Sequence, residues 1–266
     1  MTRVGITAPI VVVTDLDGTL LDHDTYDAGP AAAKVTALLE TDVRVIFCSA
    51  KTRAEQQVHR SDLGVTGWYI VENGAAVLDD DRTVKVLGLA YDDVRQRLQR
   101  AAHRLGVTLR GFGDMDVDEV AERTRLSDAA AERARRREYT EPFVVVDGGD
   151  GVGEADLREA LGDVDLGLQR GARFWTASGF HDKGVAVAAV RELFVEQHHE
   201  RPLIYGFGDT WNDAAMLAAV DVAMLVQRPD GSWADLDLDT LTRLEGIGPQ
   251  GWCIGADSVL AAAGHG

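Results

Sequence analysis

The hydrophobic positions of this chain gather in short runs that are separated by longer segments of helical pattern. Each run is almost entirely apolar, as expected of a strand that is covered on both faces. Alternation of such strands with helices indicates a parallel sheet between two helical layers, a doubly wound α/β architecture. We expect the strands at residues 11–13, 43–47, 68–71, 203–207 and 222–226, and the helices at residues 30–40, 183–194 and 214–220.

The pattern changes in the middle of the chain, between residues 85 and 179. Amphipathic helical stretches there alternate with single strands, at residues 91–105, 107–110, 118–126, 128–138, 143–147, 154–161 and 173–177. This pattern of helices and strands predicts an inserted α+β domain at 85–179. The insertion interrupts a Rossmann-like core domain formed by 1–84 and 180–266. The core and the insertion together are long enough to bury two separate hydrophobic cores.

Charge narrows the range of partners. The chain carries 44 acidic against 27 basic residues, a formal net charge of −17. A protein this acidic is not expected to draw its affinity from nucleic-acid phosphates or from anionic lipid. The apolar stretch near the start is too short for a membrane span or a signal-peptide core, and Cys48 and Cys253 lack metal-ligand spacing. We therefore expect a cytoplasmic protein with free thiols, a monomer or a homodimer that binds neither membrane nor nucleic acid.

Polar residues follow the predicted strands at the points where the strands end. Asp15 and Asp17 come after the first strand, Ser49 after the second, and Asp209 with Asp213 after the strand at 203–207. In a doubly wound sheet these carboxyl ends line one crevice. Carboxylate and amide oxygens suit a hard cation, so the pattern predicts a Mg²⁺ site in that crevice. Lys183 opens a predicted helix, where its charge opposes the helix dipole, and this indicates an anionic neighbour.

Several of these features also have simpler interpretations. Asp-x-Asp-Gly is a good turn sequence, and Ser49 could serve only as a helix cap or as a loop hydroxyl. Cys48 stands one residue too close to Arg53 for the phosphate loop of thiol phosphatases, and we interpret it as a buried hydrophobic residue. The acidic segment 235–239 is expected to be a solvated loop or helix start, and the adjacent His198 and His199 a solvated helix end.

Four strings resemble the sequence motifs of the haloacid dehalogenase-like superfamily, whose members are mostly Mg²⁺-dependent phosphatases. The strings are TDLDGTLLD, CSAKTR, HDKG and GDTWND. Longer segments are similar to the mannosyl-3-phosphoglycerate phosphatases and cover most of the chain, namely DLDGTLLDHDTYDAGPA, IFCSAKTRAEQ, IVENGAAV, GFGDMDVDEVAERTRLS, RFWTASGFHDKGVAV and GIGPQGW. This resemblance implies that the insertion is a class IIB cap that selects the substrate.

The resemblance also implies roles for individual residues. Asp15 would be the nucleophile that forms an aspartyl-phosphate, and Asp17 the general acid and base. Mg²⁺ would be held by Asp15, the main chain of Asp17, Asp209 and Asp213, of which Asp213 could instead orient a ligand or Lys183. The phosphoryl group would meet Ser49, the backbone at Ala50 and Lys183. Further contacts to an anionic substrate are expected from Lys51, Arg53 and the cap residue Arg173, and the glycines of Gly111-Phe112-Gly113 would let the cap backbone approach a sugar.

The implied reaction is the hydrolysis of mannosyl-3-phosphoglycerate to mannosylglycerate and phosphate, the last step in making a compatible solute. A phosphatase for glucosyl-3-phosphoglycerate, or for another sugar phosphate, is an alternative, because no residue identified in the sequence distinguishes a mannosyl from a glucosyl group. A non-enzymatic phospho-accepting module also groups aspartates and a lysine at the ends of a parallel sheet. That class needs neither a large cap nor a second acid two residues beyond the acceptor, so we favour the enzyme.

Overall fold

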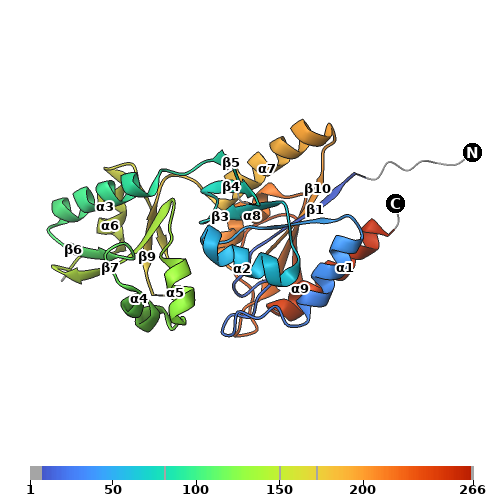
Figure 1. Ribbon diagram of the computed structural model, residues 1–266, viewed down its shortest axis with the longest axis horizontal. Helices are drawn as coiled ribbons and strands as arrows, with labels where there is room; N and C mark the ends of the chain where they lie inside the picture. The colour runs from blue at the N-terminus through green and yellow to red at the C-terminus, as the bar shows by residue number, and fades with distance from the viewer. Residues whose placement is uncertain (1–7, 81, 150, 172, 265–266) are drawn as a thin grey trace, which may run out of the picture. The chain divides into compact units, whose positions relative to one another are not determined.

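The computed structural model describes residues 8–80, 82–149, 151–171 and 173–264. Contacts between Cα atoms divide the chain into two compact units (Figure 1). The first unit contains the described residues of Met1–Ala50, His59–Lys85 and Asp182–Gly266. The second unit contains those of Lys51–Val58 and Val86–His181.

The first unit is built on a sheet of five parallel strands. Across the sheet the order is β12 (Leu241–Ile247), β11 (Val222–Gln227), β10 (Leu203–Gly208), β1 (Ile10–Thr14) and β2 (Arg44–Phe47). The middle of β1, Val11 to Val13, is fully buried. The predicted parallel sheet is confirmed for the strands at 11–13, 43–47, 203–207 and 222–226. The expected strand at 68–71 lies in a separate sheet, and β12, which was not predicted, is the fifth strand.

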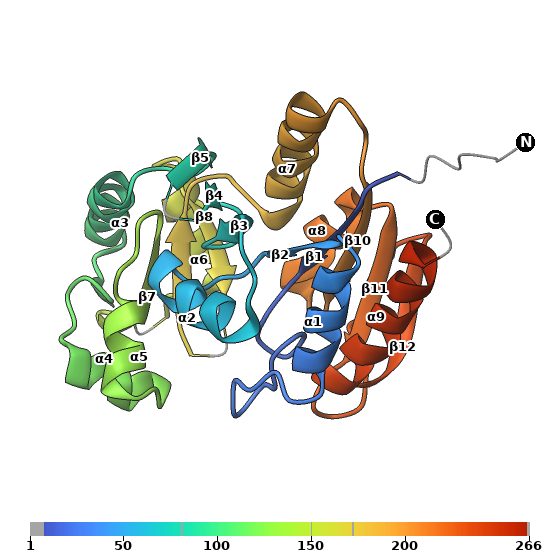
Figure 2. The same ribbon diagram turned by 45° about the vertical axis from the view of Figure 1, so that its right-hand side comes forward.

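Helices flank this sheet in two packed pairs, one of α1 (Ala31–Glu40) with α9 (Pro249–Ala263) and one of α7 (Lys183–His198) with α8 (Ala214–Ala219). Figure 2 shows α1 and α9 side by side. Along the strand order of the sheet, the chain moves toward one edge when it crosses from β1 to β2 and toward the other edge when it crosses from β10 to β11. Because such crossovers are right-handed, α1 and α8 cover opposite faces. The boundary between β1 and β10 is thus the topological switch point, where sheets of this kind bind ligands.

A smaller sheet of β3 (Trp68–Val71), β4 (Ala76–Asp79) and β5 (Arg82–Val86) belongs mainly to the first unit. The backbone N–H of Ser49 donates to the Ile70 carbonyl at 3.3 Å, so β3 is tied to the segment that leaves β2. The loop between β3 and β4 therefore lies beside the carboxyl end of β2.

The second unit contains an antiparallel sheet in the order β6 (Thr108–Gly111), β7 (Thr140–Asp147), β9 (Trp175–Ser178) and β8 (Gly167–Arg170). Helices α3 (Tyr91–Leu105) and α6 (Glu154–Gly162) pack on each other and share a buried core with the sheet. A second hydrophobic cluster joins α4 (Val117–Thr124) and α5 (Asp128–Ala134). In this cluster the rings of Phe112 and Phe174 pack edge to face, with their centroids 5.0 Å apart. The predicted α+β texture is confirmed.

Peripheral features also agree with the sequence. The acidic segment is an irregular loop in which Leu236 is buried while Asp235 and Asp237 face solvent. Cys48 and Cys253 are both free, and Cys48 is fully buried. Among the helices in the described part of the chain, none has the length and apolar character needed to cross a bilayer.

Candidate active site

Hydrogen bonds hold the end of β1 so that Asp15 lies at the topological switch point between β1 and β10. The backbone N–H of Asp15 donates to the carbonyl of Phe207 in β10 at 2.9 Å. The residue before it, Thr14, accepts a hydrogen bond from the indole nitrogen of the fully buried Trp252 at 3.0 Å. Asp15 itself is only 7% exposed. The nucleophile predicted from the sequence thus has a fixed backbone and a buried carboxylate.

The Asp-x-Asp-Gly-Thr turn is built against Asp209. Gly18 has a φ of +81°, and a Cβ at that position would lie 2.8 Å from Asp209 Oδ2. The hydroxyl of Thr19 donates to Asp209 Oδ1 at 3.1 Å. Asp17 is half-buried within the same turn, two residues beyond Asp15. The motif Asp-x-Asp-Gly-Thr is therefore a turn and also part of the candidate site, because the turn brings the loop after β1 into contact with the loop after β10.

The loop after β10 is organised by Asp213. The backbone N–H groups of Asp209 and Thr210 donate to Asp213 Oδ2 at 3.0 and 3.1 Å. A side chain at Gly208 would overlap Asp213, so the strand has to end in glycine here. Asp213 is fully buried, and its position fixes the direction in which Asp209 leaves the strand.

Lys183 joins the two loops. Its Nζ atom lies 2.6 Å from Asp15 Oδ1 and 2.7 Å from Asp213 Oδ1, and its side chain is 1% exposed. Asp182 caps the helix that begins at Lys183 by accepting from the Val185 N–H. Burial disfavours the ammonium form, but Asp15 and Asp213 more than compensate and raise the pKa of Lys183. The anionic neighbours that a lysine at a helix start indicates are these two carboxylates.

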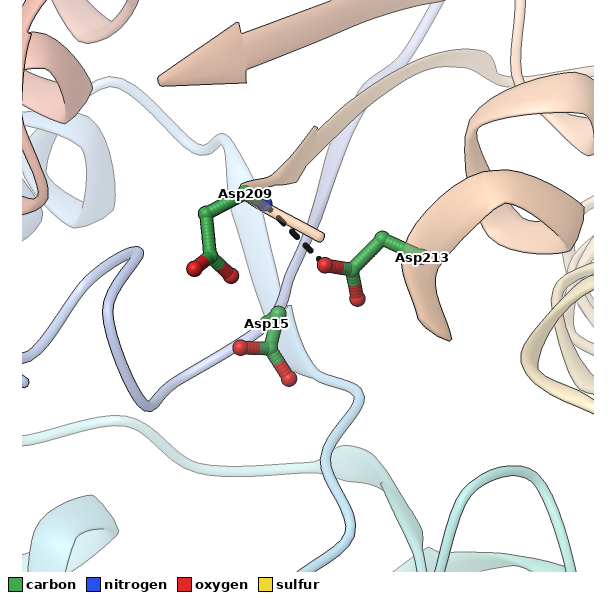
Figure 3. A group of neighbouring side chains, drawn as sticks. All are labelled: Asp15, Asp209 and Asp213. Atoms are coloured by element: carbon green, nitrogen blue, oxygen red, sulfur yellow. Dashed lines mark hydrogen bonds between the residues drawn. The ribbon is translucent and has the colours of Figure 1, made fainter. Parts of the chain in front are cut away.

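Three carboxylates converge on one space at the switch point (Figure 3). One oxygen from each of Asp15, Asp209 and Asp213 lies within 4.8 Å of the others. Burial raises the pKa of Asp15 and of Asp209, and the neighbouring carboxylates add to the effect, whereas Lys183 opposes it at both residues. Within the described part of the chain, the Lys183 ammonium is the one cation that acts on both Asp15 and Asp209, so negative charge exceeds positive charge in this cluster.

These residues fit a magnesium ion. Oxygens around octahedral Mg²⁺ lie about 2.1 Å from the metal and so up to about 4.2 Å from one another, and one oxygen from each acid lies within 4.8 Å of the others, so small side-chain movements would close the three acids around the ion. All the side-chain donors are hard carboxylate oxygens, the ligands that Mg²⁺ prefers. Asp213 already accepts hydrogen bonds on both oxygens, so Asp15 and Asp209 are the better placed direct ligands and Asp213 orients them.

Ser49 is 1% exposed, and its carbonyl accepts the Asn73 N–H at 2.9 Å. It does not cap the helix that follows. That helix, α2 (Arg53–Leu63), is capped by Thr52, whose hydroxyl accepts the Glu55 N–H at 3.2 Å, while Glu55 accepts the Thr52 N–H at 2.8 Å. The simpler interpretation of Ser49 as a cap is therefore wrong.

The predicted cationic contacts to substrate have partners within the second unit. Arg53 forms two hydrogen bonds with Glu138, at 2.9 and 3.0 Å. Arg173 is exposed and donates to the carbonyl of Thr124. Lys51 is half-buried just before α2, and Ala50 is exposed. Since its charge is already matched by Glu138, Arg53 is a weaker candidate for an anion contact than its position in the sequence suggests.

The glycine-rich segment of the second unit surrounds a buried acid that the sequence did not single out. Glu141 is 1% exposed and accepts hydrogen bonds from the Tyr91 hydroxyl at 2.6 Å and from the Gly113 N–H at 3.1 Å. Side chains at Gly111 or Gly113 would overlap Glu141 or Arg95. These glycines therefore make room for the Glu141 cluster, which explains them without a sugar.

Two further contacts at the site were also missed, those of Thr19 with Asp209 and of Asn212 with Asn73. The amide nitrogen of Asn212 donates to Asn73 Oδ1 at 2.9 Å. The available signals were the hydroxyl that follows the Asp-Gly turn and the Asn-Gly pair after β3, but neither indicates a distant partner in the sequence alone.

The class of protein defined by this fold and site is also found by comparison with known families. Residues 12–121 match the family model described as haloacid dehalogenase-like hydrolase. The crystal structure of Thermoplasma acidophilum 0175 superposes with a TM-score of 0.68 at 16% identity, covering 96% of this chain and 100% of that one, a likeness of fold.

Two curated relatives extend the similarity along nearly the whole chain. The protein of Methanococcoides burtonii is 37% identical over 258 residues, and that of Persephonella marina is 31% identical over 258 residues. Both matches cover 91% of this chain and 94% of the relative, and both relatives are named glucosyl-3-phosphoglycerate/mannosyl-3-phosphoglycerate phosphatase. The chain therefore belongs to this family of phosphatases within the haloacid dehalogenase-like hydrolases. The sequence-based assignment to an enzyme that hydrolyses phosphoric monoesters is confirmed.

Proposed function

We propose that the protein hydrolyses mannosyl-3-phosphoglycerate to mannosylglycerate and inorganic phosphate, with the glucosyl epimer as a second substrate. The observation that carries this proposal is the 37% identity over 91% of the chain to a relative whose name contains both substrates, because a match of this extent takes in most of each unit. Specificity for a sugar ester must come from residues outside the aspartate cluster, so similarity there is the relevant support.

Asp15 is the proposed nucleophile. Its carboxylate attacks phosphorus, the bond to the glycerate oxygen breaks, and an aspartyl-phosphate forms. Attack requires the ionised carboxylate, and burial works against ionisation. The Lys183 ammonium, 2.6 Å from Asp15 Oδ1, opposes that effect and favours the ionised form of the nucleophile. Lys183 therefore serves both to activate Asp15 and to balance charge on the phosphoryl oxygens.

Asp17 is the proposed general acid and base. It donates a proton to the departing glycerate oxygen and then accepts a proton from the water that hydrolyses the aspartyl-phosphate. The turn at Gly18 places it two residues from the nucleophile. Mg²⁺ bound by Asp15, Asp209 and the Asp17 carbonyl would supply charge neutralisation for the phosphoryl oxygens. The Ser49 hydroxyl and the Ala50 N–H would supply hydrogen bonds to the same oxygens.

We assign substrate selection to the insertion at residues 85–179, as a class IIB cap, with 1–84 and 180–266 as the core; nearly all of this insertion belongs to the second unit. The substrate carries a phosphate and a carboxylate, although the protein has a net charge of −17. Local cations must therefore overcome the overall field. Lys183 and Lys51, two of four lysines in the chain, lie in or next to the proposed phosphate motifs. Arg173 is a candidate for binding the carboxylate of the substrate. The enzyme is proposed to act in the cytoplasm as a monomer or a homodimer.

Phosphate release should be measured from the mannosyl and glucosyl substrates and from simple sugar phosphates, with Mg²⁺ and with a chelator. We expect the two glycosyl-3-phosphoglycerates to be hydrolysed at least about 10²-fold more efficiently than the simple esters, and only with Mg²⁺. Equal efficiency on all esters would remove the substrate assignment and leave the phosphatase chemistry standing.

The roles of the two aspartates can be tested with matched variants. Asp15→Asn and Asp17→Asn should each lower the turnover number by about 10³-fold or more, because each removes a group that reacts. Asp24→Asn, at an exposed residue in the following loop, should retain the wild-type rate. Near-normal turnover in the Asp15 variant would exclude it as the nucleophile. Accumulation of aspartyl-phosphate without repeated phosphate release in the wild-type protein would instead favour a phospho-accepting module.

A further inference from the structure

The loop between β3 and β4 has an unusual backbone. Glu72, Asn73 and Gly74 have φ values of +48°, +59° and +99°, so three consecutive residues are left-handed and two of them carry side chains. Glu72 is fully buried, and Asn73 is 7% exposed. Left-handed non-glycine residues persist where the surroundings hold them in place, and they concentrate at functional sites. The proposed reaction assigns no role to this turn.

The turn contacts three of the four loops that make the site. The Asn73 N–H donates to the Ser49 carbonyl at 2.9 Å. The Asn73 side chain accepts from the amide of Asn212 at 2.9 Å, next to Asp213. The backbone of Gly74 packs so closely on the peptide between Asp182 and Lys183 that a Cβ at Gly74 would overlap it.

We propose that Asn73 is a positioning residue that orients the Asn212 amide for phosphoryl binding. Asn212 is an exposed residue of the short helical turn Trp211–Asp213, in which the Asp213 N–H donates to the Thr210 carbonyl at 3.0 Å. An exposed amide has no preferred rotamer unless a partner selects one. Asn73 provides that partner and uses one of the two amide hydrogens, which leaves the second hydrogen as a donor for a phosphoryl oxygen. The proposal rests on the phosphatase reaction but not on the identity of the sugar.

The test uses Asn73→Gly, Asn212→Ala and the double variant. Glycine tolerates the left-handed backbone and keeps the N–H bonded to Ser49, so Asn73→Gly removes only the side chain. We expect Asn73→Gly to lower kcat by about tenfold with a smaller change in KM. We expect the double variant to lie within about twofold of Asn212→Ala, because Asn73 acts through Asn212. Full activity in either single variant, or additive losses in the double variant, would overturn the proposal.

A second readout does not depend on turnover. The affinity for inorganic phosphate in the presence of Mg²⁺, measured by calorimetry, should fall about tenfold in Asn73→Gly, as expected for loss of one oriented donor to an anion. The matched control is Asp42→Gly, at an exposed residue whose φ is also +59°, and it should bind phosphate like the wild type. Unchanged phosphate affinity in Asn73→Gly, or an equal loss in the Asp42 variant, would show that the turn is only structural. If the wild type binds phosphate but cleaves neither glycosyl substrate, only the substrate assignment fails.

Discussion

The Nζ atom of Lys183 lies 2.6 Å from Asp15 Oδ1, and this buried contact joins residues that are 168 positions apart in the chain. The same ammonium bonds Asp213 at 2.7 Å, so one cation holds together the loops after β1 and β10. Breaking a buried pair from one side leaves uncompensated charge in the interior, which is far more costly than never having had the pair. Lys183 is therefore a structural link between these loops, and the proposed reaction also gives it a catalytic role.

Lys183→Met is expected to lower the free energy of unfolding by about 3–5 kcal/mol, because Asp15 and Asp213 lose their buried counter-ion. Turnover should fall by about 10²–10³-fold. Urea denaturation at pH 7 and steady-state kinetics measure the two effects. Lys34→Met is the matched control, since Lys34 forms a surface pair with Asp257, and it should change neither. If both lysine variants were equally stable, the buried pairs would not stabilise the fold.

Gly74→Ala is expected to damage the site through its contact with Lys183. A Cβ at Gly74 would overlap the carbonyl of Asp182, the residue that caps α7. Gly67 also has a positive φ, +78°, but nothing lies within 4 Å of its Cβ position. Gly67→Ala should therefore lower the free energy of unfolding by about 1–2 kcal/mol, through backbone strain alone. Gly74→Ala should cost more and should lower turnover by about tenfold or more. Equal stability losses with full activity in both variants would contradict this view.

The core sheet and the aspartate cluster could be predicted from sequence because their signals are local. Apolar strands at 11–13 and 203–207 end in acids, and the topology of parallel sheets brings such ends together. Helix α9 was not predicted, because Gly251 and Gly255 lower its helical propensity. Those glycines are needed for packing, since a Cβ at Gly255 would overlap Phe207.

Side-chain pairing between distant segments could not be predicted in the same way. Arg53 was expected to bind an anion, but it pairs with Glu138, 85 residues away. The buried Glu141 and its partner Tyr91 are likewise 50 residues apart. A charged residue in a sequence does not reveal which opposite charge the fold will bring to it. The sequence therefore predicted which acids lie together, but it did not predict the carboxylate that pairs with Arg53.

Magnesium is expected to stabilise the folded protein, because it supplies the positive charge that Asp15, Asp209 and Asp213 lack. At a Mg²⁺ concentration of about 100 times the dissociation constant, the free energy of unfolding should rise by about 2.7 kcal/mol. Thermal melts with Mg²⁺ and with a chelator measure this shift. Asp209→Asn should abolish the shift, and Asp24→Asn should retain it. A similar Mg²⁺ effect in the Asp209 variant would mean that the ion binds elsewhere.

Asp221 gives the fold a defined sensitivity to acid. Burial raises its pKa, but the Ile204 N–H at 2.8 Å and Arg191 at 2.9 Å outweigh burial and hold the pKa below its usual value. A lowered pKa means that the ionised group stabilises the fold above the unfolded value, about 3.9. That stability is lost as the pH falls through the folded pKa. Asp221→Asn should therefore lower the free energy of unfolding by about 1–2 kcal/mol at pH 7, and this loss should shrink as the pH falls below the unfolded pKa. Urea denaturation across this range tests the prediction, and a deficit that is independent of pH would show that packing, not charge, is responsible.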